Sequence, residues 1–339
     1  MTTEQQVAIS PPGPASPGPI EAEVDNWDDD SAVGGVSLAS SKTSITSSIL
    51  RYREENGRTY HGFKDGQYAF PNDEPENDRL DLQHHVFMLT LGGKLFSAPI
   101  PKEQTLHRVL DVGTGTGIWA VDFADENPES EVVGVDLSPI EPRFVPPNLI
   151  FEIDDLEEPW TFSKPFDFIM ARLTVQFFSD PARYMQQAFG SLSSGGWIEC
   201  IDIVNPSKSD DHPNFQETQL WKWGHYRAEA AVKLRGSVSA AKRYKEQMEA
   251  AGFVNVKEII YKWPTNRWPK DKKLKELGMW VNEDIQPSLE GLSYAAFTRG
   301  LGWSKEEIEV FLTGVRRDMN DTKIHAYWEI YAVSGQKPS

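Results

Sequence analysis

One stretch, residues 109–120, constrains the fold more than any other part of the chain. It reads Val-Leu-Asp-Val-Gly-Thr-Gly-Thr-Gly-Ile-Trp-Ala, so an apolar run is followed by three glycines at alternate positions. Apolar residues then return at the spacing of a helix that packs on a sheet, at Ile118, Trp119, Val121 and Phe123. The pattern predicts a buried strand, a glycine turn and the start of a helix.

The glycines make this turn a candidate ligand site. Glycine adopts backbone dihedrals that other residues avoid, and without a Cβ it lets backbone N–H groups approach a ligand at a helix N-terminus. A tight strand-to-helix turn that binds nothing would show the same pattern, since a short glycine motif is only a hypothesis without its context.

Two acidic residues supply that context. Asp111 lies just before the turn, and about twenty residues after the glycines a second apolar strand ends at Asp136, where a nucleotide-binding fold places a ribose-binding acid. The spacing G-x-G-x-G departs from the dinucleotide pattern G-x-G-x-x-G. Because Asp111 would repel a pyrophosphate and attract an ammonium group, the residues favour a cofactor with adenosine and a cationic amino-acid tail. A helix N-cap is the alternative role for Asp136.

The ordered set of motifs resembles the class I S-adenosylmethionine-dependent methyltransferases and, within them, the fungal LaeA-like group. The resemblance extends from about Tyr52 to Pro338. Its marks are the segments 55–63, 71–74, 78–80, 111–119, 134–140 and 195–199, and the closing Lys337-Pro338. It implies an α/β, Rossmann-like fold: a seven-stranded, mostly parallel sheet with helices on both faces, an N-terminal helical cap and lid insertions.

The resemblance also implies S-adenosyl-L-methionine as the cofactor and a set of residues that bind it. By the family's pattern, Asp111 and the backbone of the glycine turn hold the methionine moiety, Asp136 accepts from both ribose hydroxyls, and Asp155 lies beside the adenine amino group. Asp154 is the weaker match for that last position. The full set implied is Asp111, Gly113, Thr114, Gly115, Gly117, Asp136, Leu137, Asp155 and Leu156.

The composition indicates three parts of the chain. Residues 1–48 are rich in Pro, Ser and acids and have too little apolar area to offset ordering entropy, which predicts a disordered tail. Its acidic run is either a solvated linker or a contact for a partner. Residues 49–105 have a broad apolar helix face and are predicted to form the N-terminal cap. Residues 106–339 are the predicted methyltransferase domain, with insertions at about 206–236 and 264–303.

Alternating strand and helix patterns predict the doubly wound core. The strands are expected at 108–112, 131–135, 149–153, 166–170, 197–203 and 253–261, and the helices at 117–126, 180–192 and 239–251. Ser304 and Glu307 fit a capping box at the start of a helix that runs to about Asn320. The last strand, 325–333, is expected to close the sheet in an antiparallel sense. The insertion at 264–303 is rich in Trp and Gly and is interpreted as irregular.

Several classes of function are disfavoured. A net charge of −17 argues against a general nucleic-acid-binding surface, which requires clustered Lys and Arg. The single cysteine, Cys200, allows no internal disulfide and indicates a reducing compartment. The seven histidines form no ligand-spaced cluster, so we expect no metal site. No apolar run approaches the ~20 residues that span a bilayer, so we expect a protein of the cytoplasm or the nucleus with no membrane partner.

The acceptor side is less constrained by the sequence. Methyl transfer is a displacement that positioning and exclusion of water can promote, so a general base is optional. The candidates for a catalytic role are His225, Tyr226, Tyr60 and His61, and ordinary packing is the alternative for each. Trp223, His225 and Tyr226 are predicted to line the acceptor pocket. Arg172, Gln176 and Phe177 are placed on the same rim, with an ion pair as the alternative role for Arg172.

Two functions follow from the resemblance. The first is an enzyme that methylates an O, N or C atom of a small secondary metabolite. The second is a LaeA-like regulator of secondary metabolism and development that acts through protein partners in the nucleus. The intact glycine turn and ribose-binding acid favour the enzyme, and the sequence leaves the acceptor and the pathway open.

Overall fold

The computed structural model describes residues 18, 52–62, 69–142, 144–234 and 236–339. The predicted disordered tail, 1–48, therefore lies outside the described residues, apart from Gly18. None of the described helices is both long enough and apolar enough to cross a membrane.

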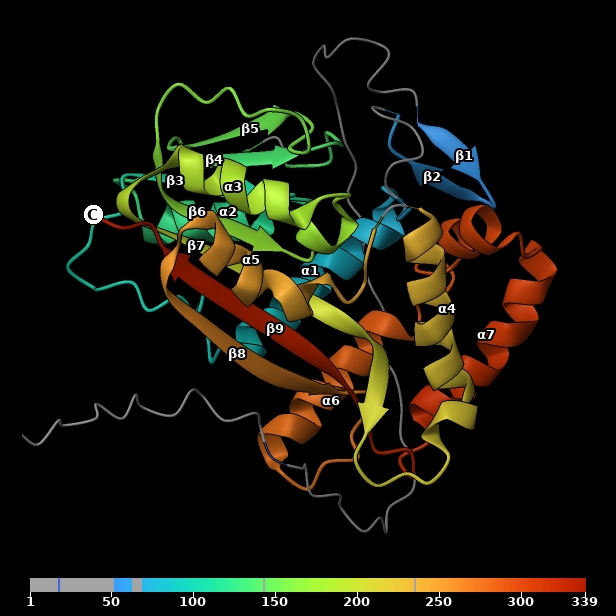
Figure 1. The fold of residues 1–339 in the computed structure, drawn as a ribbon. Coiled ribbons are helices and arrows are strands. Elements are labelled where there is room, and N and C mark those ends of the chain that lie inside the picture. The colour runs from blue at the N-terminus through green and yellow to red at the C-terminus, as the bar shows by residue number, and fades with distance from the viewer. Residues whose placement is uncertain (1–17, 19–51, 63–68, 143, 235) are drawn as a thin grey trace, which may run out of the picture.

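A seven-stranded sheet forms the centre of the molecule, as predicted (Figure 1). In spatial order its strands are β5 (Leu149–Ile153), β4 (Glu131–Asp136), β3 (Arg108–Val112), β6 (Phe166–Arg172), β7 (Leu192–Ser209), β9 (Ala326–Gln336) and β8 (Val254–Pro264). The first five run parallel, and β9 pairs antiparallel with both β7 and β8. The antiparallel last strand is thus confirmed.

Helices cover both faces of this sheet, and two separate hydrophobic clusters lie between the layers. Helices α1 (Glu74–Thr90) and α2 (Ile118–Glu126) pack on one face, and α3 (Pro181–Ser191) and α5 (Tyr244–Ala251) on the other. Side chains alternate along β3: Val109 belongs to the cluster on the α2 side, and Leu110 belongs to the cluster on the α3 side. The same alternation turns Asp111 toward the α1 and α2 side.

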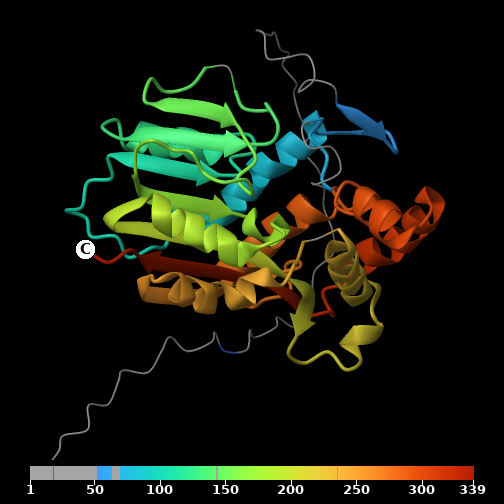
Figure 2. The ribbon, with the colours of Figure 1, turned by 45° about the horizontal axis from the view of Figure 1, so that its top comes forward.

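Three helices from the C-terminal half lie beyond the carboxyl ends of the parallel strands. They are α4 (Gln219–Lys233), α6 (Lys272–Ile285) and α7 (Lys305–Asn320). Figure 2 shows the arrowheads of β3, β4 and β6 directed toward α1 and this group of helices. Short 3-10 turns lie at η1 (Val175–Phe177), η2 (Phe215–Glu217) and η3 (Ala240–Arg243). The carboxyl edge of the sheet is therefore roofed by segments that do not belong to the core.

The segment 264–303 is not irregular, contrary to the prediction. It contains α6 and the π-helical turn η4 (Ala296–Leu301). Asp271 caps α6 by accepting from the backbone N–H groups of Lys273 and Leu274, both at 3.0 Å. Leu277, Val281 and Ile285 are buried at four-residue spacing, which gives α6 one inward face.

The N-terminal cap begins with a small sheet of β1 (Arg53–Glu55) and β2 (Arg58–Tyr60). Two ion pairs connect it to the rest of the chain. Arg58 donates to both carboxylate oxygens of Asp73 at 2.6 Å, and Arg299 donates to Glu55 at 2.7 Å and 3.0 Å. Asp73 is also the N-cap of α1, so one carboxylate joins the small sheet to that helix.

At the start of α7, the predicted capping box is present. The Ser304 hydroxyl accepts from the backbone N–H of Glu307, and the Glu307 carboxylate accepts from the backbone N–H of Ser304. Each side chain thus satisfies a backbone donor that the first turn of a helix leaves unpaired.

A buried carboxyl group on one strand of the sheet makes the stability of the fold depend on pH. Burial raises the pKa of Asp202, on β7, to about 8, while hydrogen bonds from the Tyr244 hydroxyl and the Gln176 backbone N–H lower it by less. Between about pH 4 and pH 8 the carboxyl group is protonated in the folded state and ionised in the unfolded state. The free energy of unfolding therefore falls across that range as pH rises.

Asp202→Asn should remove this dependence, because the amide cannot ionise and its oxygen still accepts from Tyr244. Scanning calorimetry at several pH values measures this. We expect the thermal midpoint of the variant to rise relative to that of the unaltered protein as pH increases from 4 to 8. A constant difference between the two proteins over that range would show that Asp202 does not titrate there.

Candidate functional site

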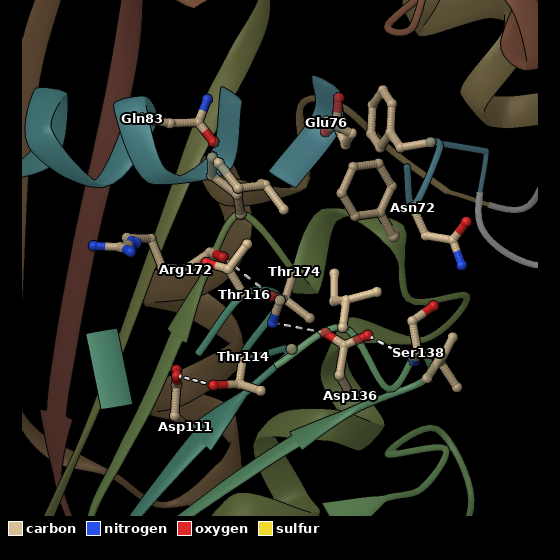
Figure 3. A pocket seen from close by; sticks show the side chains of 18 of the residues that line it. Asn72, Glu76, Gln83, Asp111, Thr114, Thr116, Asp136, Ser138, Arg172 and Thr174 are labelled. Atoms are coloured by element: carbon tan, nitrogen blue, oxygen red, sulfur yellow. Dashed lines mark hydrogen bonds between the residues drawn. The ribbon is translucent and has the colours of Figure 1, made fainter. Parts of the chain in front are cut away.

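A pocket opens at the carboxyl ends of β3, β4 and β6, beneath α1 (Figure 3). Its floor is made by the glycine turn and by the loops that follow β4, β5 and β6. Its roof is made by α1 and the segment before it, with contributions from α4, α6 and Leu292. A parallel sheet places ligands at this edge, so the pocket lies where the sequence predicted a site.

The glycine turn lies against the neighbouring strand and leaves its backbone open to the pocket. Gly113 and Gly115 have φ angles of 68° and 58°, which favour glycine. The backbone N–H of Gly113 donates to Val135 at 2.8 Å. A Cβ on Gly113 would lie 2.3 Å from the Thr174 hydroxyl oxygen, so a larger residue would not fit between β3 and the loop after β6.

Asp111 lies buried on the pocket wall below this turn. Its Oδ2 accepts from the Thr114 hydroxyl at 2.6 Å. Burial raises the pKa of Asp111 to about 6, and the nearby Arg172 guanidinium opposes that rise. A cationic ligand group beside Asp111 would favour the ionised carboxylate further.

Gly117 does not line the pocket, although it belongs to the predicted cofactor-binding set. It is the N-cap of α2, with φ of 78°, and a Cβ there would lie 2.4 Å from the tip of the Phe151 ring. The third glycine thus allows the close packing of α2 against β5.

Asp136 lies at the end of β4 with both carboxylate oxygens directed by backbone donors. Its Oδ2 accepts from the backbone N–H of Gly115 at 2.9 Å, and its Oδ1 accepts from that of Ser138 at 3.0 Å (Figure 3). Burial raises the pKa of Asp136, and these backbone N–H groups oppose the rise. Residues 137–142, which directly follow it, are not helical, so the N-cap alternative is wrong. Each oxygen keeps a lone pair for a ligand hydroxyl.

The loop after β5 forms the next part of the wall. Asp155 and Leu156 are buried there, and Leu137 approaches from the loop after β4. Asp155 accepts from the backbone N–H of Glu157 at 3.0 Å, which orients its carboxylate. Asp154 also borders the pocket but is exposed.

Arg172, at the end of β6, is a half-buried cation of the pocket wall that is connected to two helices. Its Nη2 donates to His84 Nδ1 at 3.1 Å, and His84 Nε2 lies 3.0 Å from Asp122 Oδ2. Burial lowers the pKa of His84 to about 3 and that of Arg172 to about 10. Because Arg172 can only donate, the neutral imidazole carries its proton on Nε2 and donates to Asp122. The guanidinium is therefore held close to Asp111.

The three residues predicted to line an acceptor pocket do not lie on the wall of the pocket described above. Trp223 is buried and donates to the Ser293 hydroxyl at 2.8 Å. Tyr226 packs edge-on against Phe297, Trp303 and Phe311, and His225 stacks on Trp221 at the surface. The pocket residue of α4 is the next one, Arg227.

The other two candidates, Tyr60 and His61, are also absent from the pocket wall. Both side chains are buried in the cap. The Arg299 guanidinium lies 4.8 Å from the centre of the Tyr60 ring. Burial raises the pKa of Tyr60 to about 12, so its hydroxyl stays protonated at neutral pH and the phenolate that could act as a base does not form. His61 lies close enough to influence the Asp136 carboxylate.

A row of polar residues on α1, not predicted from the sequence, also faces the pocket. Glu76, Arg79, Gln83 and His84 are buried and line the roof of the pocket. Figure 3 shows Glu76 and Gln83 on the roof above the glycine turn and Asp136. Their spacing of three, four and one residues puts all four on one side of a helix that is otherwise apolar there. That stripe was a readable signal, since buried charges are rarely tolerated without a partner or a ligand.

A family model and several known proteins that resemble this chain all indicate the same family. The methyltransferase domain family matches residues 77–258. Methyltransferase pytC of Aspergillus terreus is 37% identical over 301 residues, which cover 88% of this chain and 92% of that protein. Secondary metabolism regulator LAE1 of Cochliobolus heterostrophus is 38% identical, covering 84% and 94% of the two chains. Protein-methionine methyltransferase laeA of Emericella nidulans is 33% identical, covering 85% and 77%.

The matched segment begins within α1 and continues through the glycine turn, the end of β4 and the loop after β6, so it includes the floor of the pocket. The chain therefore belongs to the S-adenosylmethionine-dependent methyltransferases and, within them, to the LaeA-like group.

Proposed function

We propose that this methyltransferase transfers a methyl group to a small organic acceptor of secondary metabolism. One observation carries the proposal: a single pocket joins the acidic end beside the glycine turn to an apolar end lined by Phe70, Ile203, Ile285 and Leu292. A cofactor at the first end and an acceptor at the second would meet inside the pocket, under the roof of α1.

The residues at the acidic end fit S-adenosylmethionine, which supplies a sulfonium methyl group when it is bound. We assign the ribose hydroxyls to Asp136, because each of its oxygens retains a free lone pair and is already oriented by the backbone. Asp155 and Leu156 would flank the adenine. Asp111 and Arg172 form a pair of opposite charges beside Gly113, which suits the ammonium and carboxylate groups of an amino-acid tail.

The chain's contribution to transfer on this proposal is positioning and exclusion of water. The buried roof residues and the apolar end keep the reacting atoms away from solvent, and fixed neighbours hold them in line. In the transfer, the acceptor atom would form a bond to the methyl carbon as the bond from that carbon to sulfur breaks, S-adenosylhomocysteine would be the leaving group, and the proton of the acceptor O–H or N–H would pass to water. No side chain among the described residues is assigned as a general base.

The test is a comparison of metabolites from cells with and without the intact gene, together with assays of the purified protein. We expect S-adenosylhomocysteine to bind in calorimetry and at least one metabolite to be replaced, in cells that lack the gene, by a precursor one methyl group lighter. The purified protein should convert that precursor. Binding of S-adenosylhomocysteine without turnover of any such precursor would reject the small-molecule acceptor.

A regulatory function is the second candidate, and the 38% identity to a protein named secondary metabolism regulator LAE1 favours it. In that case the methyl acceptor is a protein side chain, and the chain works with protein partners in the nucleus. Recovery of methylated methionine in the chain itself or in a co-purified protein, with no change in any single metabolite scaffold, would favour this function.

A further inference from the structure

The pocket wall contains buried polar atoms that the protein itself does not satisfy. Among the described residues, three such side-chain atoms on the wall have no hydrogen-bond partner: Asn72 Nδ2, Glu76 Oε2 and Gln176 Oε1. Glu76 is 2% exposed and Gln176 is 4% exposed. Buried polar atoms in folded proteins are nearly always paired, so an unpaired one that faces a pocket suggests a ligand atom.

Glu76 is held in a fixed orientation by its other oxygen. Its Oε1 accepts from Arg79 at 2.7 Å and 3.0 Å, and Arg79 also donates to Asp284 at 3.3 Å. One guanidinium therefore serves two buried carboxyl groups. The free oxygen of Glu76 is an acceptor in surroundings that are already acidic, so it should attract a hydrogen-bond donor and repel an anion.

Gln176 approaches the pocket from the 3-10 turn η1 after β6. Its backbone carbonyl accepts from the backbone N–H of Ser237 at 2.8 Å, which fixes the turn. The neighbouring Phe177 packs edge-on against Phe70, with ring centroids 5.1 Å apart, and both rings line the pocket. Gln176 thus lines the same pocket as two packed aromatic rings.

We propose that Glu76 and Gln176 form a subsite for the methyl acceptor, which would be an aromatic or similarly apolar molecule with hydroxyl or amine hydrogen-bond donors. This inference rests on the proposed function, since it describes the acceptor of the same pocket. Neither oxygen can pair with a carboxylate, an ether or a thioether, because these groups bring no donor. The Arg227 guanidinium, 5.7 Å from the centre of the Phe70 ring, is a group of this wall that a carboxylate could approach instead. Phe70 and Phe177 supply the contact surface for a ring.

Stability measurements can separate this function from a structural one. Gln176→Met keeps the length of the side chain and removes an unpaired buried oxygen, so the thermal midpoint should stay the same or rise. Gln83→Met is the matched control, because Gln83 lines the same pocket but donates to Asp284 at 3.1 Å. Its loss leaves Asp284 short of a donor, so its midpoint should fall. A fall of equal size in both variants would overturn the proposal.

Binding measurements complete the test with four probes that share one ring system: naphthol, naphthylamine, methoxynaphthalene and naphthoate. On the protein saturated with S-adenosylhomocysteine, we expect naphthol and naphthylamine to bind ~10-fold more tightly than the other two. Gln176→Met and Glu76→Gln should remove most of that preference and leave the affinity for S-adenosylhomocysteine unchanged.

Each other result has a definite meaning. Equal binding of all four probes, no binding of any, or a preference that survives in both variants would overturn the subsite. Failure of S-adenosylhomocysteine to bind would instead reject the proposed cofactor assignment, and this is measured before any probe is added. The acceptor subsite and the cofactor assignment are therefore rejected by different measurements.

Discussion

Replacing Asp136 by Ala is expected to weaken the binding of S-adenosylmethionine and S-adenosylhomocysteine about 10–100-fold. Hydrogen bonds to a charged group contribute ~1.5–3 kcal/mol, and RT converts that energy into this range of affinity. The change also releases the backbone N–H groups of Gly115 and Ser138, which the carboxylate holds at 2.9 Å and 3.0 Å. Isothermal titration calorimetry on the purified variant measures the effect.

Asp154→Ala is the matched control for this prediction. Asp154 borders the same pocket and carries the same charge, but it is exposed and is not assigned a contact with the ribose. We expect its affinity for both ligands to stay within a few-fold of that of the unaltered protein. Equal losses in the two variants would indicate a general effect of charge, and tighter binding of NAD than of S-adenosylhomocysteine would refute the site.

The largest effect on stability is expected for Gly278→Ala in α6. A Cβ at this position would lie 2.1 Å from the backbone carbonyl oxygen of Asn266, which cannot turn away as a side chain would. The Asn266 side chain is anchored as well, by donating to Met319 at 2.7 Å. Helix α6 must therefore move, at a cost of ~1–3 kcal/mol or more. Chemical denaturation followed by circular dichroism measures it.

Gly190→Ala provides the comparison, since it makes the same change inside α3. A Cβ there meets nothing within 4 Å, and the residue is exposed. Alanine has the higher helix propensity, so this variant should be more stable by about 0.5–1 kcal/mol. If both variants lost stability equally, the close approach of α6 to Asn266 would not be the cause.

The sheet was predictable because its strands carry strong local signals. Buried parallel strands such as β4 read as continuous apolar runs, and β4 and β6 end at Asp136 and Arg172, which line the pocket. The capping box of α7 was equally local. Helix α6 was missed because only three of its five buried residues, Leu277, Val281 and Ile285, carry large apolar side chains, and the nearby Trp and Gly residues suggested loops. Local pattern therefore decided which elements could be found.

The acidic side of the pocket could be predicted for the same reason, and the side proposed for the acceptor could not. Asp111 and Asp136 lie at the carboxyl ends of neighbouring strands, β3 and β4, so sequence order places them at one edge of the sheet. The side proposed for the acceptor combines Glu76, Arg227 and Ile285, which only the tertiary fold brings together. In α4 the prediction chose the neighbours of Arg227, and successive side chains of a helix differ in direction by roughly 100°. That helix is apolar on more than one side, so its sequence does not mark the side that faces the pocket.

Phe151 makes two distant positions interdependent. Its ring occupies the space where a Cβ on Gly134 would lie, at 2.6 Å, as well as the space beside Gly117. Gly117 needs glycine for its backbone as well, whereas Gly134 has an ordinary strand conformation and is constrained by side chains alone: the Phe151 ring and the Thr114 hydroxyl oxygen, which lies 2.9 Å from the Cβ position. A smaller residue at position 151 would remove only the first of these two contacts. Alanine at position 134 should therefore also displace Thr114, whose hydroxyl donates to Asp111. A substitution in β4 would thus reach the pocket wall through the glycine turn.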